Sequence, residues 1–563
     1  MQQYALTIDY SVNGIEESYC TGQGDNNASL DICAHEGVQR LTITLCPKQP
    51  ILLRNAVVTF HHTFTPDDSI FLNGYQSWTD SHEMDIHQMM PGLTLVPDAL
   101  IQSNHLDRYG DYRFARYPQP HGFTYAYIRR GESLRFFGSL SECSGFTAIY
   151  IHADENTVTM EKDCENLLID APYEAFDLCL CEGKEQQVFD LYFAQMGIIK
   201  PSLPRSTGYT TWYQHYEHID WQVVTHNLQA MAAFPYPFDV FQIDDGYQTA
   251  VGDWLAVDRR KFPEGMKPVA DAIIAQGMTP GLWLAPFCAQ KDSRLAAEHP
   301  QWLVQDDEGK PVCCGSNWGG FYALDVCNPQ VLDYLANVFD VVLNQWGYGL
   351  VKLDFLYAAC VQPRPRKTRG QIMCEAMDFL RACVGDKRII GCGVPLGAAF
   401  GKVDYCRIGC DVSLSWDDEP HENSMHRERI STKNTILNTV FRRQLHGRAF
   451  LNDPDVFLLR EGGLALTAAQ KDILAQINCL CGGLLFTSDD VSHYGTQQRT
   501  QLLSRLNADE ACIQSVELAG DILTLRYRQG GRDNQMAIDM MAGKWLRSPQ
   551  GDQRQAESRP ALP

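Results

Sequence analysis

The fold is decided by the stretch Gly349-Leu350-Val351-Lys352-Leu353-Asp354-Phe355. Its apolar run from Leu350 to Leu353 is interrupted only by Lys352, and the preceding residues 331–346 carry apolar side chains at helical spacing. A helix, a glycine-containing turn and a buried strand together make one step of a βα barrel. In such barrels the chemistry lies at the carboxyl ends of the strands, and Asp354 stands at that end.

Lys352 and Asp354 are two residues apart, so their side chains point the same way along a strand. A cation aimed in the same direction as a carboxylate favours the ionised carboxylate, and a nucleophile needs that form. The same pair is also compatible with a buried structural ion pair. This stretch alone leaves both interpretations open.

The composition indicates a soluble globular protein of two or three domains. The chain has 563 residues, of which 45% are hydrophobic and 21% charged. A net charge of −22 disfavours nucleic acid and anionic membranes as partners. No apolar run reaches transmembrane length, so we expect no membrane partner, and the oligomeric state stays open.

The first ten residues and the cysteines bear on location. The start, residues 1–10, shows no basic segment followed by an apolar one, so no signal peptide is expected. Twenty cysteines without such a signal indicate reduced thiols and a cytoplasmic location. Close pairs such as Cys313/Cys314 and Cys406/Cys410 lack zinc-site spacing, so a metal cluster is not expected.

The hydrophobic pattern predicts three domains. Residues 1–200 contain many strand-like stretches separated by polar turns, which is typical of a β-sandwich. After a proline-rich linker, residues 205–507 alternate strands with helices, as in a (β/α)8 barrel. Residues 510–563 return to strands in a small antiparallel β-domain, whose tail from 552 has a disordered composition. The eight barrel strands are predicted at 208–212, 238–243, 279–284, 350–354, 388–392, 404–408, 448–452 and 484–487.

Polar and aromatic side chains gather at the ends of these predicted strands, namely Asp244, Asp245, Trp283, Lys352, Asp354, Arg407, Asp411, Asp453 and Asp489. A single aspartate at a strand end is more often a helix N-cap than a catalyst, and this reading stays open for the last two. Carboxylates together with tryptophan and arginine suit a sugar, whose hydroxyls need hydrogen-bond partners and whose C–H face stacks on indole. Glycoside hydrolysis needs two carboxyl groups across the scissile bond, and Asp354 and Asp411 can supply them.

Two further motifs bear on function. In the first domain, Asn73-Gly74-Tyr75-Gln76-Ser77-Trp78 is an aromatic turn, either a hairpin capped by a core tryptophan or a sugar-facing loop. The stretch Gly391-Cys392-Gly393-Val394-Pro395-Leu396-Gly397 looks like a dinucleotide-binding loop, but its third glycine comes one position late and in the fifth repeat. No nucleotide cofactor is therefore expected.

With these residues assembled, the chain resembles the α-galactosidases of glycoside hydrolase family 36, in the same clan as family 27. The resemblance rests on six stretches in family order, at 73–78, 243–246, 281–287, 352–355, 391–397 and 407–412. It implies an N-terminal β-supersandwich, a catalytic (β/α)8 TIM barrel and a small C-terminal antiparallel β-domain.

The resemblance also implies roles for individual residues. Asp354 is the expected nucleophile, and Asp411 the expected acid/base, held protonated by burial or by the charge of Asp354. The residues expected to line the sugar site are Asp244, Asp245, Trp283, Lys352 and Arg407, with Trp78 reaching in from the sandwich and Cys392 near the 2-position. No role is assigned to Trp416-Asp417-Asp418-Glu419.

The expected function is a retaining exo-glycosidase that hydrolyses terminal non-reducing α-D-galactosyl residues by double displacement, without a metal or organic cofactor. Two alternatives stay open. An α-N-acetylgalactosaminidase has the same motifs, and Cys392 and Gly393 are small enough to leave room for an acetamido group. A catalytically inactive sugar-binding protein would need a missing carboxylate, and both carboxylates are present.

Overall fold

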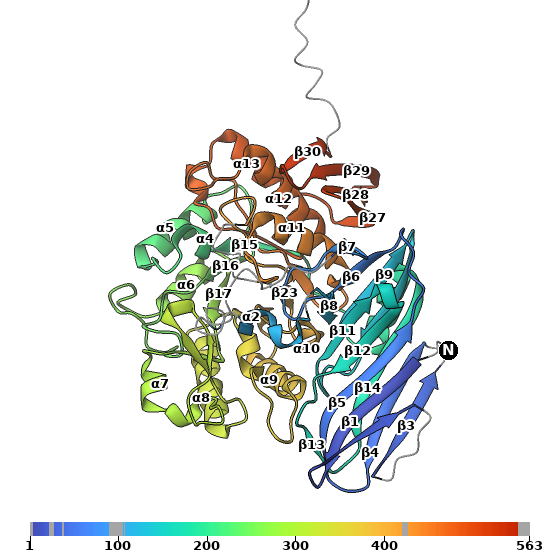
Figure 1. The fold of residues 1–563 in the computed structure, drawn as a ribbon. Helices are drawn as coiled ribbons and strands as arrows, with labels where there is room; N and C mark the ends of the chain where they lie inside the picture. The colour runs from blue at the N-terminus through green and yellow to red at the C-terminus, as the bar shows by residue number, and fades with distance from the viewer. Residues whose placement is uncertain are drawn as a thin grey trace, which may run out of the picture.

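The computed structural model describes residues 4–21, 27–35, 39–88, 105, 107–116, 118–418 and 426–549. They form two seven-stranded antiparallel sheets, a curled nine-stranded parallel sheet flanked by helices, a three-stranded sheet and a four-stranded C-terminal sheet (Figure 1). The multidomain α/β and all-β class predicted from the sequence is confirmed at this level. The boundaries of the three domains stay predictions.

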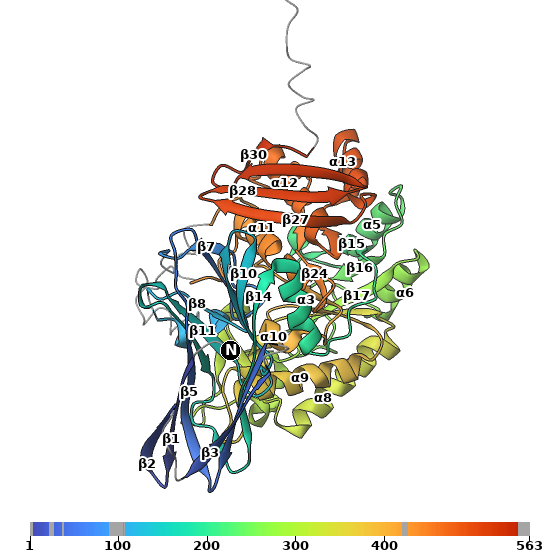
Figure 2. The ribbon, with the colours of Figure 1, turned by 90° about the vertical axis from the view of Figure 1, so that its right-hand side faces the viewer.

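Two antiparallel sheets form the N-terminal part, and Figure 2 shows them as two layers. Their alternating apolar side chains meet in a shared core that includes Ile8 and Val58 of one sheet and Ile43 and Phe137 of the other. The first sheet contains β1 (Tyr4–Val12), β2 (Ile15–Cys20), β5 (Ile51–His61), β8 (His121–Phe123), β11 (Thr147–His152), β12 (Thr157–Lys162) and β13 (Leu168–Ile169). The second contains β3 (Ala28–His35), β4 (Arg40–Pro47), β6 (Ser69–Leu72), β7 (Glu83–Asp85), β9 (Tyr125–Arg130), β10 (Ser133–Ser139) and β14 (Tyr173–Lys184).

The parallel sheet contains all eight predicted strands. In sequence they are β15 (Ser206–Thr210), β16 (Val240–Ile243), β17 (Thr279–Leu284), β21 (Leu350–Leu353), β22 (Arg388–Gly391), β23 (Tyr405–Arg407), β24 (Leu451–Asp453) with β25 (Val456–Phe457), and β26 (Leu484–Thr487). At the position of the seventh strand, predicted at 448–452, there are two short strands. β24 pairs with β23, whereas β25 pairs with β26. Only residues 454–455 separate the two halves, so the sheet curls until its two ends are neighbours in sequence.

Helices connect these strands and have clear sequence signals. Thr368 and Thr467 form capping boxes with the glutamines three residues later, and Asn328 caps a helix that begins with proline. The helices are α2 (Asp107–Gly110), α3 (Glu185–Gln195), α4 (Trp212–His215), α5 (Trp221–Ala232), α6 (Lys267–Ala275), α7 (Arg294–Glu298), α8 (Pro329–Asp340), α9 (Arg369–Val384), α10 (Leu396–Ala399), α11 (Thr432–Phe441), α12 (Ala468–Cys481) and α13 (Thr496–Leu506). None of the helices described is long and apolar enough to cross a membrane.

Two smaller sheets complete the fold. An excursion between β17 and β21, which the sequence did not predict, forms β18 (Cys288–Gln290), β19 (Cys313–Gly315) and β20 (Phe321–Ala323). The C-terminal sheet has four strands, β27 (Ala511–Ala519), β28 (Ile522–Gln529), β29 (Arg532–Asp539) and β30 (Lys544–Arg547). It packs on α12, where the Trp545 indole donates to Asp472. The tail from 552 lies outside the described residues.

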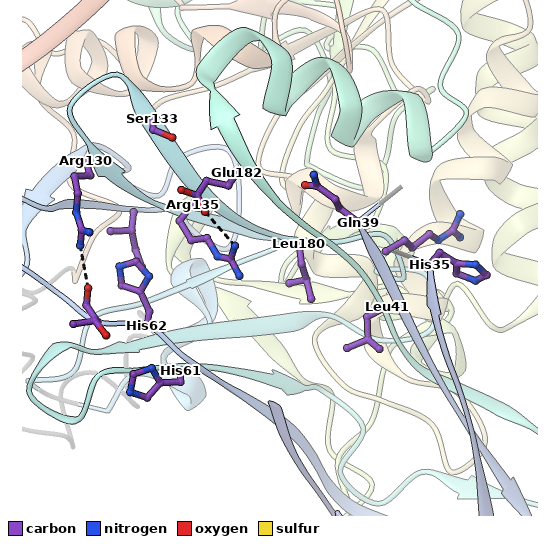
Figure 3. Close-up of a pocket in the computed structure, with 13 residues that line it drawn as sticks. His35, Gln39, Leu41, His61, His62, Arg130, Ser133, Arg135, Leu180 and Glu182 are labelled. Carbon is purple, nitrogen blue, oxygen red and sulfur yellow. Dashed lines mark hydrogen bonds and ion pairs between the residues drawn. The ribbon is translucent and has the colours of Figure 1, made fainter. Parts of the chain in front are cut away.

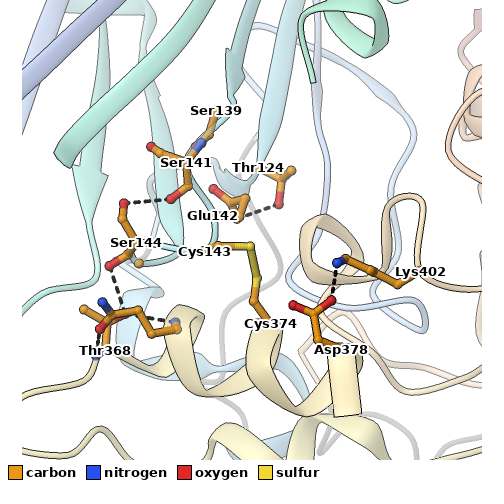
Figure 4. The surroundings of a disulfide bond; sticks show 12 residues. Thr124, Ser139, Ser141, Glu142, Cys143, Ser144, Thr368, Cys374, Asp378 and Lys402 are labelled. Atoms are coloured by element: carbon orange, nitrogen blue, oxygen red, sulfur yellow. Dashed lines mark hydrogen bonds and ion pairs between the residues drawn. A yellow bond between two sulfur atoms is a disulfide. The ribbon is translucent and has the colours of Figure 1, made fainter. Parts of the chain in front are cut away.

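A disulfide joins the N-terminal sheets to the parallel-sheet region. Cys143, exposed in the turn after β10, is bonded to Cys374 of α9 across 231 residues of sequence (Figure 4). The expectation of reduced thiols is therefore wrong for this pair, while the other eighteen cysteines are free. The pairing was not predictable because these two cysteines are distant in sequence and meet only through tertiary packing.

Replacing Cys143 by serine is expected to lower the free energy of unfolding by about 2–4 kcal/mol, because the disulfide restricts a long loop in the unfolded chain. Urea unfolding of the oxidised wild type and the variant measures this difference. Cys383→Ser is the matched control, since Cys383 is a free thiol on the same helix. Equal stability of the wild type with and without reductant would contradict the prediction.

Candidate active site

A cavity of about 420 Å³ opens at the carboxyl ends of the parallel strands. Seven of the nine predicted site residues line it, namely Trp78, Asp244, Asp245, Trp283, Lys352, Asp354 and Asp411. The other two, Cys392 and Arg407, are buried and do not line the cavity. Their predicted contact with a sugar stays a prediction.

Asp244 and Lys352 form a buried ion pair in the wall of the cavity. Lys352 Nζ lies 2.9 Å from Asp244 Oδ2, and the same oxygen accepts hydrogen bonds from Gln242 and Thr210. Burial alone would lower the pKa of Lys352, but the charges of Asp244 and then Asp354 outweigh it and raise this pKa, so the ammonium stays charged. Lys352 is therefore hydrogen-bonded to Asp244, whereas Asp354 influences Lys352 only through its charge.

Both oxygens of Asp354 are held by N–H donors. The Trp283 indole donates to Oδ2 at 3.1 Å, and the backbone N–H of Phe355 donates to Oδ1 at 2.9 Å. Phe355 has a φ of 52°, a left-handed conformation that is strained for a bulky side chain. The chain therefore turns sharply just after the carboxylate, as occurs where a functional group must be presented.

Arg407 organises three carboxylates at the ends of β23 and β24. Its Nη1 donates to Asp411 at 2.6 Å, its Nη2 to Asp455 at 2.9 Å and its Nε to Asp453 at 3.3 Å. Burial raises the pKa of Asp455 to about 6, Arg407 opposes this, and the charges of Asp411 and Asp453 add to the increase. The Asp411 side chain is 37% exposed, so the burial expected for it from the sequence is not found.

Asp245 is another carboxylate whose pKa is raised. It accepts hydrogen bonds from Gln248 at 2.5 Å and from the Trp318 indole at 2.8 Å. Burial raises its pKa to about 6, although both hydrogen bonds favour the ionised form. Trp318 lies between β19 and β20, so the unpredicted excursion supplies part of this site.

Trp78 enters the cavity from the loop after β6. Its indole is partly buried, donates from Nε1 to Cys392 Sγ at 3.3 Å and meets the Phe355 ring edge-on at 5.0 Å. Gln76 and Ser77 are fully buried, although both side chains are polar. They are accommodated because the amide of Gln76 donates to the Tyr109 carbonyl and the Ser77 hydroxyl accepts from a backbone N–H.

Several residues that line the cavity were not predicted from the sequence. They come from loops and short helices and are Tyr109, Trp212, Glu217, Ser316, Asn317, Trp318, Phe355, Cys410, Glu428 and Ile430. Among them, the Tyr109 hydroxyl donates to Asn317 at 2.6 Å, which ties helix α2 to the excursion. In the sequence these residues stand out only by their aromatic or polar side chains, which many surface residues share.

The acidic segment after Asp411 has a structural explanation. The Trp416 indole donates to the Met540 carbonyl, and Asp417 and Asp418 pair with Lys433 and Arg429. None of these three residues lines the cavity. Glu419 lies outside the described residues.

A larger cavity, about 780 Å³, lies between strands of the N-terminal sheets (Figure 3). Its arginines Arg40, Arg130 and Arg135 pair with Asp177, Asp68 and Glu182. It contains none of the predicted site residues. Size alone therefore does not identify the functional site, whereas the carboxylates at the strand ends do.

Carboxylates, indoles and an ion-paired lysine at the carboxyl ends of parallel strands define a site of the glycoside hydrolase type. Comparisons with known proteins agree. Residues 211–373 match the melibiase family model. An α-galactosidase from Thermus thermophilus, solved with p-nitrophenyl α-D-galactopyranoside, is 27% identical with a TM-score of 0.72, over 90% of this chain and 98% of that one.

Curated relatives match over shorter stretches. A galactosaminidase from Flavonifractor plautii, described as acting on A-type blood α-D-galactosamine, is 35% identical over 22% of this chain and 12% of its own length. An Escherichia coli α-galactosidase is 31% identical over 20% of this chain and 16% of its own length. The chain thus aligns with less than a fifth of the length of either relative. Together with the fold, these matches confirm the resemblance to the α-galactosidases of glycoside hydrolase family 36.

Proposed function

We propose that this protein is a retaining α-galactosidase, EC 3.2.1.22, which removes terminal non-reducing α-D-galactosyl residues. The observation that carries the proposal is that Asp354 and Asp411 line one cavity with the Asp244–Lys352 pair. The similar Thermus thermophilus enzyme, solved with an aryl α-galactoside and with stachyose, supports it. As part of the proposal, the curled sheet is a closed (β/α)8 barrel, with β24 and β25 together as its seventh strand.

The proposed reaction has two steps. Asp354 attacks the anomeric carbon and forms a covalent glycosyl ester, while Asp411 gives its proton to the departing glycosidic oxygen. Asp411 then removes a proton from water, which attacks the same carbon, releases Asp354 and yields galactose with retained configuration. The two N–H donors on Asp354 fix the orientation of its carboxylate for the first attack, and Arg407 fixes that of Asp411.

Asp244 and Asp245 are the proposed grip on the sugar. They are adjacent, they both line the cavity, and their orientations are set by Lys352 and the Trp318 indole. Galactose has an axial 4-hydroxyl near its 6-hydroxyl, and neighbouring carboxylates can accept hydrogen bonds from both. Trp78 and Trp283 supply aromatic surface for the sugar ring.

The geometry near β22 favours galactose over N-acetylgalactosamine. A Cβ atom placed on Gly393 would come within 2.9 Å of the Trp78 ring, so the space at this glycine is already filled. Cys392 is fully buried and holds the Trp78 indole, so it leaves no pocket for an acetamido group there. The alternative α-N-acetylgalactosaminidase thus loses the feature on which it rested.

A comparison of two aryl glycosides tests the proposed function. We expect p-nitrophenyl α-galactoside to be hydrolysed with a kcat/KM at least about ten-fold higher than the N-acetylgalactosaminide, since the latter must displace an aromatic contact of about 1–1.5 kcal/mol. A faster N-acetylgalactosaminide would reverse the choice of sugar. Failure to turn over either glycoside would favour a catalytically inactive sugar-binding protein.

Trp78→Ala is expected to lower kcat/KM for α-galactosides about ten-fold, the scale of one aromatic contact with the sugar. The melting temperature should change little, because the indole is only partly buried. Trp545→Ala is a suitable control, since this partly buried indole lies in the C-terminal sheet. A stable Trp78 variant with unchanged kinetics would remove the N-terminal loop from the site.

A further inference from the structure

The loop that carries Trp78 is held by a buried arginine from the opposite part of the molecule. Arg442 follows α11 directly and has 0% of its surface exposed. Its guanidinium donates to Asn73 Oδ1 at 3.0 Å and, at 2.7 and 3.2 Å, to the carbonyl oxygens of Ser77 and Gln76. A fourth bond, 2.9 Å long, reaches the carbonyl oxygen of Ile408.

None of these four acceptors is a carboxylate. Burying a charge without a counter-charge is unfavourable, and burial lowers the pKa of Arg442 to about 10. Carbonyl groups offset this cost only when their geometry matches the donors. A guanidinium has five donors in a planar fork and can reach several acceptors at once, whereas a lysine ammonium is a point charge. The site is therefore built for arginine.

The four contacts connect the two sides of the proposed sugar site. Ile408 belongs to the strand end between Arg407 and Asp411, so one arm of the fork holds the segment that presents the proposed acid. The other contacts hold the residues just before Trp78. Ser77 also accepts from the backbone N–H of Gly393, next to the cysteine that receives the Trp78 indole.

A second buried arginine holds the base of the same loop. Arg427 donates to the carbonyl oxygens of Leu72 and Asp80, and to that of His121. Because Arg427 anchors both ends of the loop, loss of Arg442 would release the segment that bears Trp78 without freeing the whole connection. The two arginines thus have separable tasks.

We propose that Arg442 is a positioning residue, which fixes Trp78 against the strand ends that present Asp354 and Asp411. Its effect on turnover rests on the function proposed above, whereas its hold on the loop does not. None of the four acceptors of the Arg442 guanidinium lines the cavity. Arg442 therefore acts on the site only through the loop and Ile408.

A double-mutant cycle on kcat/KM tests the catalytic part, with Arg442→Met, Trp78→Ala and the combined variant. Arg442→Met alone should lose about ten-fold, like Trp78→Ala. If Arg442 acts through Trp78, the double variant loses little beyond about ten-fold, whereas independent effects would multiply to about 100-fold. A multiplied loss would overturn the proposal.

Arg443→Met is the matched control for this cycle. Arg443 is the next residue, is also buried, and also bridges to an earlier part of the chain, through Glu185 at the start of α3, at 2.6 Å. Its hydrogen bonds go to Glu185 and to the Val440 carbonyl, so it does not hold the loop from 73 to 78. This variant should lose stability yet keep kcat/KM within about two-fold of the wild type.

Hydrogen exchange of the peptide covering 73–78 tests the structural part without any substrate. Exchange should be faster in Arg442→Met than in the wild type and unchanged in Arg443→Met. Unchanged exchange in Arg442→Met would overturn the inference, whether or not the enzyme hydrolyses galactosides. If wild-type protein lacks galactosidase activity, only the proposed function fails.

Should Arg442→Met not fold, Asn73→Ala removes one acceptor of the guanidinium and replaces Arg442→Met in both experiments, with the same expected outcomes.

Discussion

Replacing Asp354 by alanine or asparagine is expected to lower kcat and kcat/KM at least about 10⁴-fold on every α-galactoside, because no other group can form the covalent intermediate. Asparagine keeps the shape of the side chain, and its single amide oxygen can still accept from one of the two donors, Trp283 or the Phe355 N–H. Its folding should be close to that of the wild type. The loss of rate then reports chemistry and not a collapsed site.

Asp404→Asn is the matched control for Asp354. Asp404 precedes β23 at the opposite end of the sheet, where it pairs with Arg381 at 2.9 Å and accepts from the Ile389 N–H. Active sites of parallel barrels do not lie at that end, so kcat/KM should stay within about two-fold. An Asp354 variant that retains a tenth of the wild-type kcat/KM on several substrates would show that Asp354 is not the nucleophile.

Asp411→Ala is expected to separate substrates by their leaving groups. For stachyose-type substrates, whose leaving alcohol needs a proton, kcat/KM should fall about 10²–10⁴-fold. For an aryl galactoside with an acidic phenol, kcat/KM should fall far less, because this parameter reports only the step that forms the intermediate. Added azide should then restore kcat on the aryl substrate, since it attacks without needing a base.

Arg407 makes this variant interpretable. It contacts Asp453 and Asp455 as well as Asp411, so two carboxylates still balance its charge in Asp411→Ala. The circular dichroism spectrum and melting temperature should therefore stay near those of the wild type. Equal losses on aryl and alkyl substrates would show that Asp411 does not donate the proton.

The parallel sheet was predictable because its strands are buried on both faces. Such strands read as short apolar runs, and the residue that follows each run must lie at the same rim as the others. Asp244, Asp354 and Asp411 were found in this way. The seventh strand was predicted to begin three residues too early. Pro454 separates it into two short strands, β24 and β25, which pair with different neighbours.

The contacts that tune the site were not predictable. Lys352 shares a strand direction with Asp354, yet its ammonium bonds to Asp244, which follows β16, on the far side of β17 in the sheet. Trp318 reaches Asp245 from the excursion between β17 and β21, 73 positions further along the sequence. Local periodicity contains no information on such approaches, since they depend on how complete elements pack.

The mixed origin of the cavity wall has an evolutionary consequence. Trp78 and Tyr109 come from the N-terminal third of the chain, while Trp318 and Ile430 come from excursions inserted between strands of the parallel sheet. A gene rearrangement that transferred the parallel sheet alone would carry the carboxylates but not the indole opposite them. We therefore expect the N-terminal sheets to be inherited together with the parallel sheet, and changes of substrate range to arise by substitution within this linked set of residues instead of by exchange of whole domains.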